Sequence, residues 1–377
     1  MLIQEGLARI EFEELDEVFF NPRGKLSRSF GVLGIRALSR ALGEELVVAD
    51  AFTGVGTRSI RYLLETGDAV AGVHANDSSA PALEFAIRNA RLNGVIERMK
   101  FHCLEARRFF WRSVEANRFY HFIDIDVFGT PMQFIPFAVN ALKRQGAIYV
   151  TSTDTAPLCG INRKAAFRNY GAVTENVEFC HEAGARIVIA AVLSASARQA
   201  YVARPLFTLF DGYAFRILMM MERGRKSFPH KEIGFIFRCP STGEVKAVKQ
   251  HRLGTVDMEC PSELQAIGPM WLGDMHDPEF LKLMLESLSE NWFDERDRHK
   301  LKRLIKTMQM EIDMPPFFHD LSVLADRIGI STPRKMDMVN ALRREGFRAG
   351  VTHFSGTGIK TDADHITLAR IARELVT

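Results

Sequence analysis

The first 220 residues alternate short apolar runs with longer segments whose apolar positions recur at helical spacing. Runs at 46–50 and 69–75 have the length of buried strands, and the segments 58–66 and 78–92 after them each have one apolar face. Further β-type runs lie at 99–103, 121–125, 147–151, 186–193 and 213–219. Strands that alternate with helices predict an α/β fold, a Rossmann-like and mostly parallel sheet with helices on both faces.

This pattern changes at 222–230, a polar and basic stretch broken by glycine and proline. Beyond it the runs predict a smaller α+β part, with strands at 233–239 and 244–248, helices at 278–288 and 297–310, and then a helix, helix, strand order at 320–328, 333–344 and 346–354. Thr332 as N-cap and Pro333 at the first helical position would start the second helix of that winged-helix-like order. We therefore expect two domains, at 1–225 and 226–377.

Length and composition agree with this organisation. The chain has 377 residues, 47% of them hydrophobic, which suffices for two buried cores. The formal net charge of +3 neither requires nor excludes a polyanionic partner. Five scattered cysteines, a charged amino-terminal segment and a longest apolar stretch, 187–197, that is too short to cross a bilayer predict a cytoplasmic protein with no membrane role.

A glycine-rich turn after the first predicted strand indicates a ligand site. Asp50 ends that strand, and Gly54 and Gly56 let the backbone of the turn approach a ligand closely. Asp77 ends the next strand, where a carboxylate can accept hydrogen bonds from both hydroxyls of a ribose. Asp50 would repel a pyrophosphate, so a cationic ligand fits better. We expect S-adenosylmethionine, with Asp50 facing its ammonium and Arg58 its carboxylate; an ordinary glycine turn is the alternative.

The third predicted strand end supplies Glu105 and Ala106, which are candidates for the adenine edge of the same ligand. Glu105 lies beside Arg107 and Arg108, so a solvated ion pair is the alternative explanation.

The fourth predicted strand ends in Asp126, Val127 and Phe128, which resemble the Asp-Pro-Pro-Tyr/Phe reaction loop of amino-group methyltransferases. The lone pair of an exocyclic amine is delocalised into its ring, and a carboxylate that accepts its hydrogen bond and then its proton restores nucleophilicity. We assign this role to Asp126, stacking on the base to Phe128, and a structural role to Asp124. The alternative is that Asp126 only caps the following helix.

Several strings together resemble the tRNA guanosine-26 dimethyltransferase family, whose members put two methyl groups on the amine of one tRNA guanosine. The matching strings include VFFNPRGKLSR (18–28), DAFTGVGTRSIR (50–61), HFIDIDVFGTP (121–131), TSTDTAPLCG (151–160) and THFSGTGIKTD (352–362). The resemblance runs almost from end to end and implies tRNA as the partner, with no DNA.

This resemblance also implies roles for single residues. Arg28, Arg58, Asp77, Glu105 and Ala106 would bind S-adenosylmethionine, Asp126 would be the catalytic group, and Phe19 and Phe128 would sandwich the target guanine. For Phe19, burial in the core is the alternative.

The chain departs from the family pattern at three places. Val127 replaces a proline of the usual motif, and Glu105 replaces an aspartate. Where many relatives have paired Cys-Pro-x-Cys knuckles, only Cys239 and Cys260 remain, which make a poor tetrahedral zinc site, so we expect no structural metal.

Basic residues gather in the carboxyl-terminal part, as a large polyanionic substrate requires. One cluster, with Lys300 and Arg303, lies on the predicted helix 297–310; another, with Arg343 and Arg344, precedes the segment 352–360, which carries His353 and Lys360. We expect these six residues to contact RNA; a solvated charged helix face is the alternative for the first cluster.

The sequence leaves other functions open. The enzyme could methylate a different tRNA guanosine amine or add a single methyl group. A protein glutamine-amide methyltransferase has a similar reaction loop, but it would not need the basic clusters. A non-catalytic RNA-binding protein is a third class, suggested only by Val127. The oligomeric state is not fixed by the sequence, and nothing in it opposes a monomer.

Overall fold

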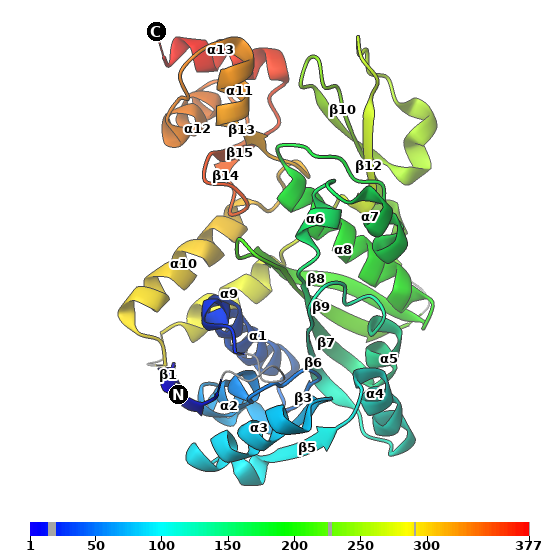
Figure 1. The fold of residues 1–377 in the computed structure, drawn as a ribbon. Helices are drawn as coiled ribbons and strands as arrows, with labels where there is room; N and C mark the ends of the chain where they lie inside the picture. The colour runs from blue at the N-terminus through cyan, green and yellow to red at the C-terminus, as the bar shows by residue number, and fades with distance from the viewer. Residues whose placement is uncertain (14–19, 225–227, 290–291, 377) are drawn as a thin grey trace.

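A computed structural model describes residues 1–13, 20–224, 228–289 and 292–376. A large sheet with helices on both faces forms the lower part of the molecule in Figure 1, and a smaller group of helices and short strands lies above it. Among the described residues, no helix is long and apolar enough to cross a membrane.

The large sheet has seven strands in the order β5-β4-β3-β6-β7-β9-β8. Their bounds are β3 (Leu46–Asp50), β4 (Val70–Asp77), β5 (Met99–Cys103), β6 (Tyr120–Asp126), β7 (Leu142–Ser152), β8 (Tyr201–Phe210) and β9 (Phe215–Arg223). The first five strands in this order are parallel, whereas β9 runs antiparallel to both β7 and β8. The predicted α/β class is therefore confirmed, and the carboxyl ends of β3, β4 and β6 share one edge.

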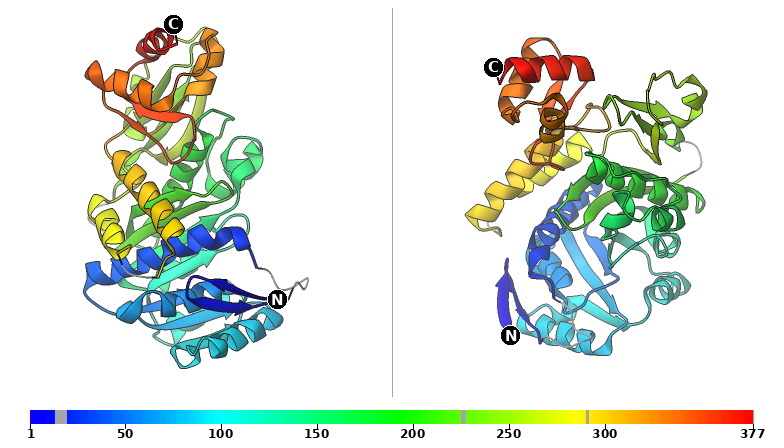
Figure 2. Two further views of the ribbon diagram at one scale, coloured as in Figure 1. Left: turned by 90° about the vertical axis from the view of Figure 1, so that its left-hand side faces the viewer. Right: turned by 45° about the horizontal axis from the view of Figure 1, so that its top comes forward.

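Helices cover both faces of this sheet (Figures 1 and 2). One apolar core contains side chains of α1 (Lys25–Leu42), α2 (Thr57–Leu64), α3 (Ala80–Leu92) and α9 (Pro278–Ser287). The core on the other face contains those of α4 (Ala106–Glu115), α5 (Ile135–Asn140), α6 (Thr155–Leu158), α7 (Arg163–Tyr170) and α8 (Cys180–Ala197). Burial from both sides is what apolar strands of a parallel sheet require.

One predicted strand, 186–193, is wrong, because these residues lie inside α8. The helix packs between the sheet and strand β12 (Gln265–Trp271), so nearly every side of it is buried. A helix that is apolar all round has no polar stripe from which its period can be recognised. Strand β8, which follows this helix, was not predicted.

The remaining elements form three small sheets and the carboxyl-terminal helices. A hairpin of β1 (Leu2–Glu5) and β2 (Ala8–Glu11) precedes α1, and β10 (Ile233–Arg238) lies between β11 (Val245–Lys249) and β12. The third sheet and its helices are β13 (His319–Asp320), β15 (Gly358–Thr361) and β14 (Ala349–Val351) with α11 (Leu321–Ile328), α12 (Lys335–Arg344) and α13 (His365–Glu374). Helix α12 begins two residues later than predicted, with Arg334 rather than Thr332 at its N-cap.

The two parts of the chain share packed surfaces. Helix α9 packs along α1, and α10 (Glu295–Met310) packs beside α9 (Figure 2). Ile236, Met270 and Phe318 belong to the same apolar core as α8. The predicted domain boundary falls at residues 225–227, which lie outside the described residues, so the division at 225 stays a prediction.

Candidate active site

A cavity of about 330 Å³ opens where the carboxyl ends of β3, β4 and β6 meet. Each of these strands contributes through the residues at or just after its end, and α1, α2 and β9 supply one arginine each. The residues that line it include Arg28, Gly54, Arg58, Asp77, Asp126, Phe128 and Arg216. The structure thus brings together six of the residues singled out in the sequence.

The glycine turn has the backbone conformation that its sequence requires. Gly54 and Gly56 have φ values of 53° and 87°, which are left-handed and disfavoured for other residues. A Cβ atom on Gly56 would lie 3.2 Å from the Cα of Ala86 in α3, so the turn also needs the missing side chain for packing. Gly56 does not line the cavity itself; it begins α2, whose first turn does.

Asp77 holds this turn in place and faces the cavity. Its Oδ2 accepts a hydrogen bond of 2.9 Å from the Gly54 N–H, and its Oδ1 accepts one of 3.0 Å from the Ser79 N–H. Each carboxylate oxygen can accept two hydrogen bonds, so with respect to the described residues both keep one acceptor position. Asp77 is therefore equipped to bind a pair of hydroxyls.

Asp50 is not where the sequence analysis expected it. Its side chain is fully buried below the turn, where Oδ2 accepts a 2.8 Å hydrogen bond from the Ser59 hydroxyl, and it does not line the cavity. Burial and the negative charge of Asp124 raise the pKa of Asp50 to about 7. A side chain at the end of a central parallel strand is enclosed by its neighbours, so an ammonium partner cannot reach it.

Glu105 and Ala106 also lie outside the cavity lining. Glu105 caps α4, accepting from the Arg107 N–H at 3.0 Å, and its exposed carboxylate pairs with Arg107 Nε at 2.9 Å. Ala106 is buried in the core. The structure thus has the solvated ion pair that was the alternative for Glu105.

Asp126 lies between two guanidinium groups. Its Oδ2 accepts from Arg58 Nε at 2.8 Å, and its Oδ1 accepts from Arg216 Nη1 at 2.5 Å. Burial favours the protonated acid, but the positive charges of Arg58 and Arg216 outweigh it and hold the pKa of Asp126 well below its ordinary value. The carboxylate is therefore ionised at neutral pH.

Asp124, two residues earlier on the same strand, is fully buried. It pairs with Arg58 Nη1 at 3.3 Å and accepts a hydrogen bond from the Tyr62 hydroxyl. Burial raises the pKa of Asp124. All three nitrogens of the Arg58 guanidinium are engaged, because Nη2 also donates to Ser27 Oγ at 3.0 Å. Arg58 is therefore not free for a ligand carboxylate in this structure.

Arg28 is similarly engaged, with Glu5 of the amino-terminal hairpin. Its Nε donates to Glu5 Oε1 at 2.6 Å, and its Nη2 donates to the Asn21 carbonyl at 3.0 Å.

Among the aromatic residues, Phe128 is 62% exposed at the cavity, while Phe19 lies outside the described residues. Its neighbour Phe20 lines the cavity, so the amino-terminal segment supplies an aromatic ring to this site.

Sequence reasoning missed Arg216, which lies on the antiparallel strand β9. The available signal was a single cation in the apolar run Phe215–Met221. A charged residue that is buried in such a run needs a partner, and here the partners are Asp126 and Asp211.

Comparisons with known proteins identify the family of this chain. A model of N2,N2-dimethylguanosine tRNA methyltransferases matches residues 2–373. The chain belongs to this family. The tRNA (guanine(26)-N(2))-dimethyltransferase of Pyrococcus abyssi is 32% identical over 384 residues, 96% of each chain. The tRNA (guanine(26)-N(2)/guanine(27)-N(2))-dimethyltransferase of Aquifex aeolicus is 32% identical over 99% of this chain and 96% of its own.

A solved member of the family has the same fold. The structure of Trm1 from Pyrococcus horikoshii in complex with S-adenosyl-L-methionine matches with a TM-score of 0.85 at 30% identity, over 98% of this chain and 99% of that chain. The resemblance to the dimethylguanosine tRNA methyltransferase family is therefore confirmed, as is the fold class.

The basic residues expected to contact RNA in this family member fall into two groups. Lys300 and Arg303 are exposed on α10, and Arg343 and Arg344 are exposed at the end of α12, although Arg343 Nε donates to the Ala349 carbonyl at 2.8 Å. These four stay predictions.

His353 and Lys360, in contrast, are corrected by the structure. Lys360 is fully buried, with its Nζ 2.5 Å from Glu182 Oε1. The buried side chain of His353 has its Nδ1 2.8 Å from Glu311 Oε1. Both belong to the junction between α8, α10 and the third sheet, where a polyanion cannot reach them.

The two cysteines left from the family's knuckles are joined in a disulfide, Cys239–Cys260. In this form neither sulfur is a thiolate, so neither is a metal ligand. Two other groups of ligand-type residues lie within the described chain, Cys159 with Cys180 and His181, and His276 with Glu311 and His353. The expectation of no zinc stays a prediction.

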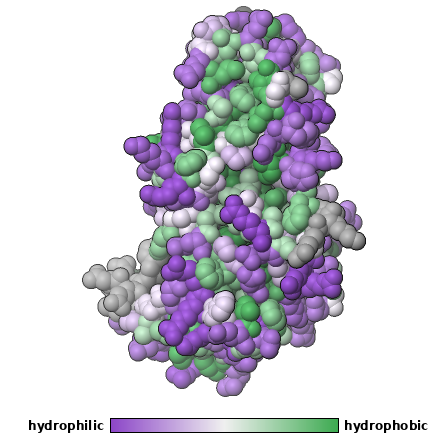
Figure 3. Space-filling model, turned by 90° about the vertical axis from the view of Figure 1, so that its right-hand side faces the viewer, coloured by the Kyte–Doolittle hydropathy of each residue, from purple (hydrophilic) through white to green (hydrophobic). Residues whose placement is uncertain are grey.

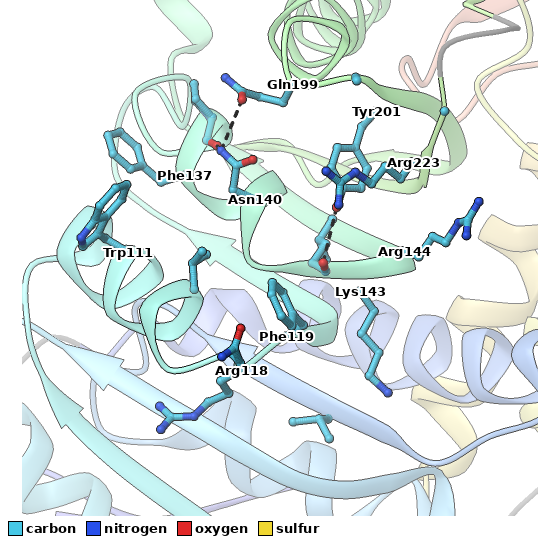
Figure 4. Close-up of a pocket in the computed structure, with 17 residues that line it drawn as sticks. Trp111, Arg118, Phe119, Phe137, Asn140, Lys143, Arg144, Gln199, Tyr201 and Arg223 are labelled. Atoms are coloured by element: carbon cyan, nitrogen blue, oxygen red, sulfur yellow. Dashed lines mark hydrogen bonds between the residues drawn. The ribbon is translucent and has the colours of Figure 1, made fainter.

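A larger cleft of about 1320 Å³ lies at the opposite end of the sheet, where β6 and β7 begin (Figure 4). Its lining includes Trp111, Phe137 and Arg144, but none of the motif residues. The face turned to the right in Figure 1 is mostly polar with apolar residues between (Figure 3). The motif residues that the structure brings together thus line the smaller cavity, at the carboxyl ends of the strands.

Proposed function

We propose that this protein transfers methyl groups from S-adenosylmethionine to the N2 amine of guanosine 26 in tRNA. In this proposal Asp126 accepts a hydrogen bond from the amine and then its proton. The enzyme class and cofactor follow from membership of the family. The observation that carries the residue assignment is the cavity itself, in which Asp126, Phe128 and the Gly54 turn with Asp77 converge.

The residues of the cavity fit S-adenosylmethionine. Asp77 keeps one acceptor position on each carboxylate oxygen, which suits the two ribose hydroxyls. The glycine turn leads directly into the first turn of α2, where backbone N–H groups and the helix dipole attract a carboxylate. Arg28 also lines the cavity, where its guanidinium is paired with Glu5.

When bound, S-adenosylmethionine supplies a methyl group on a positively charged sulfur. Asp126 accepts a hydrogen bond from the amine and turns the nitrogen lone pair toward that methyl group. As the new carbon–nitrogen bond forms and the carbon–sulfur bond breaks, the positive charge moves from sulfur to nitrogen. The cationic nitrogen is a strong acid, so Asp126 takes its proton despite a low pKa and then releases it to water.

Aromatic residues at the cavity support binding of a base that has left its stack. Phe128 is largely exposed, as a ring must be if it is to receive a base on its face. The resemblance assigns the opposite face to Phe19, and Phe20, the next residue in the chain, lines the cavity.

Cations near the cavity support a polyanionic substrate. Lys25 of α1 pairs with Asp297 of α10 at 2.5 Å, which brings the first turns of the two helices together. A cleft at this contact is lined by Arg23, Lys25 and Lys300. Phosphates on either side of a flipped nucleotide would meet these side chains, with Arg303 further along α10.

The decisive experiment is nucleoside mass spectrometry on unmodified tRNA transcripts incubated with the protein and S-adenosylmethionine. We expect dimethylguanosine with G26 and none with A26. The Aquifex relative's name includes position 27, so a third transcript carries G26 with A27. Unchanged product in that third transcript assigns the reaction to position 26; halved product adds position 27 to the substrate. Equal methylation of the A26 transcript would overturn the proposal, as would no methylation of any.

The variant Asp126→Ala tests the residue assignment separately. It should abolish transfer while calorimetry still detects binding of S-adenosylmethionine and of tRNA. Retained activity would move the acceptor role to another residue. Methylation of a glutamine-containing peptide in place of tRNA would support the protein-methyltransferase alternative, and a failure to bind S-adenosylmethionine would support the non-catalytic one.

A further inference from the structure

Arg216 is held at the cavity by three anchors. Its Nη1 donates to Asp126 Oδ1 at 2.5 Å and to Thr151 Oγ1 at 2.6 Å, and its Nε donates to Asp211 Oδ2 at 3.3 Å. Only 3% of the residue is exposed, yet it lines the cavity. The guanidinium plane therefore has a fixed direction before any substrate arrives.

One nitrogen of this guanidinium keeps its donors. No hydrogen bond among the described residues uses Nη2 of Arg216, whereas a guanidinium has five N–H groups to give. Asp126 also has an unused acceptor position, since among the described residues its Oδ1 accepts only from Arg216 and a carboxylate oxygen can accept twice. A free acceptor and a free donor thus lie next to each other in the cavity.

Arg58, on the other side of Asp126, differs in this respect. Its Nε, Nη1 and Nη2 are all engaged, with Asp126, the fully buried Asp124 and Ser27. Arg58 therefore holds the carboxylate from behind. Of the two cations that contact Asp126, Arg216 is the one with a guanidinium nitrogen that makes no hydrogen bond among the described residues.

We propose that Asp126 and Arg216 together recognise the Watson–Crick edge of the target guanine, with Asp126 accepting from the amine and Arg216 Nη2 donating to O6. The inference rests on the proposed function and adds a specificity-determining residue to it. Along its Watson–Crick edge, guanine has N–H donors at N2 and N1 and then an acceptor at O6. The carboxylate of Asp126 followed by the Nη2 of Arg216 offers an acceptor and then a donor, which complements this edge. Adenine has a donor where guanine has O6, so it would meet Arg216 donor to donor.

The test compares G26 with 2-aminopurine at position 26, which keeps the N2 amine but lacks O6. Wild-type protein should methylate the G26 transcript with a kcat/KM about 10- to 100-fold higher, because a hydrogen bond from a charged donor is lost with the analogue. In Arg216→Gln the G26 value should fall toward that of the analogue, so that most of this preference disappears. Arg216→Lys keeps the charge without the planar fork and should keep an intermediate preference.

Arg204→Gln on the neighbouring strand is the matched control, since Arg204 lies in an exposed ion pair with Asp277 and should leave the preference unchanged. Two results would overturn the inference. One is an equal loss on both substrates in Arg216→Gln, which is what a purely structural role produces. The other, which needs no variant to fold, is wild-type protein that methylates both transcripts equally. Failure of the proposed function is a different result, because then wild-type protein makes no dimethylguanosine on G26.

Discussion

Lys360 offers a direct test of the difference between a buried cation and an RNA contact. Its ammonium lies 2.5 Å from Glu182 Oε1 and donates to the Pro315 carbonyl at 2.8 Å. Glu182 is also paired with Arg186 of the same helix, at 2.8 Å. Burial lowers the pKa of Lys360, and the opposite charge of Glu182 offsets this in part. Lys360→Met removes one of the two cations that pair with the Glu182 carboxylate.

The expected loss of stability follows from these contacts. Removing one partner of a buried ion pair costs about 3–5 kcal/mol, and the lower value applies here because Glu182 keeps Arg186. For an unfolding entropy that scales with a chain of this length, about 3 kcal/mol lowers Tm by roughly 4 °C. Glu182→Gln should cost more, about 5 kcal/mol, because it leaves Lys360 and Arg186 buried together without the carboxylate that both contact.

Thermal unfolding and salt-dependent tRNA binding distinguish the two roles. Lys360→Met should lower Tm and leave the slope of log K against log salt unchanged. Lys300→Met, at an exposed position on α10, should leave Tm unchanged and reduce that slope by about one. A Lys360→Met protein with normal Tm and a reduced slope would refute the reasoning, because it would mean that tRNA reaches this ammonium.

Four further outcomes are expected. Asp126→Asn should reduce transfer at least ~100-fold, measured as kcat, because the amide is no base; wild-type kcat should show no inflection from this group between pH 5 and 9, since its pKa is already low. The pKa of Asp50 is about 7 in the folded state and about 3.8 in the unfolded state. Between these pH values the folded protein holds one more proton than the unfolded chain, so the free energy of unfolding falls as pH rises, by up to ~1.4 kcal/mol per pH unit. Chemical unfolding at several pH values should show this slope in wild type and not in Asp50→Asn. Arg343→Ala with Arg344→Ala should weaken tRNA binding and flatten its salt dependence, and an unchanged slope would remove both from the interface. Elemental analysis of purified protein should find no stoichiometric zinc, and one zinc per chain would contradict the expectation.

The sequence predicted those features that depend on local pattern and on the rule that parallel strands end at one edge. Strand 99–103 has the predicted bounds, and Asp77 and Asp126 are both at strand ends that meet in the cavity. Features that depend on distant partners were not predictable in this way. Asp50 also ends a strand, but the neighbours that bury it come from other elements. The partner of Lys360 is Glu182, which is far from it in the sequence, so no local pattern predicts this pair.

Arg216 is a site residue that the sequence did not predict, again because its position depends on distant partners. Its strand joins the sheet antiparallel to β7, through a register that pairs Arg216 with Thr151. That register, and not any motif, puts a guanidinium beside the carboxylate at the end of β6. A cation that reaches a site from an antiparallel neighbour has no fixed spacing from the motif it serves, so only the folded chain reveals it.

Helix α1 connects the cavity to α10, whose exposed cations are predicted to contact tRNA. At its first turns Arg28 faces the cavity, while Lys25 pairs with Asp294 and Asp297 at the start of α10. One helix thus links the cavity to the start of α10. Because a displacement of about 1 Å can cost a factor of ~100 in rate, a methyltransferase that acts on one nucleotide of a large RNA gains accuracy when its RNA contacts and its reaction loop share such a support. The amino-terminal hairpin extends this support, since Glu5 pairs with Arg28 and Arg61 in the same layer.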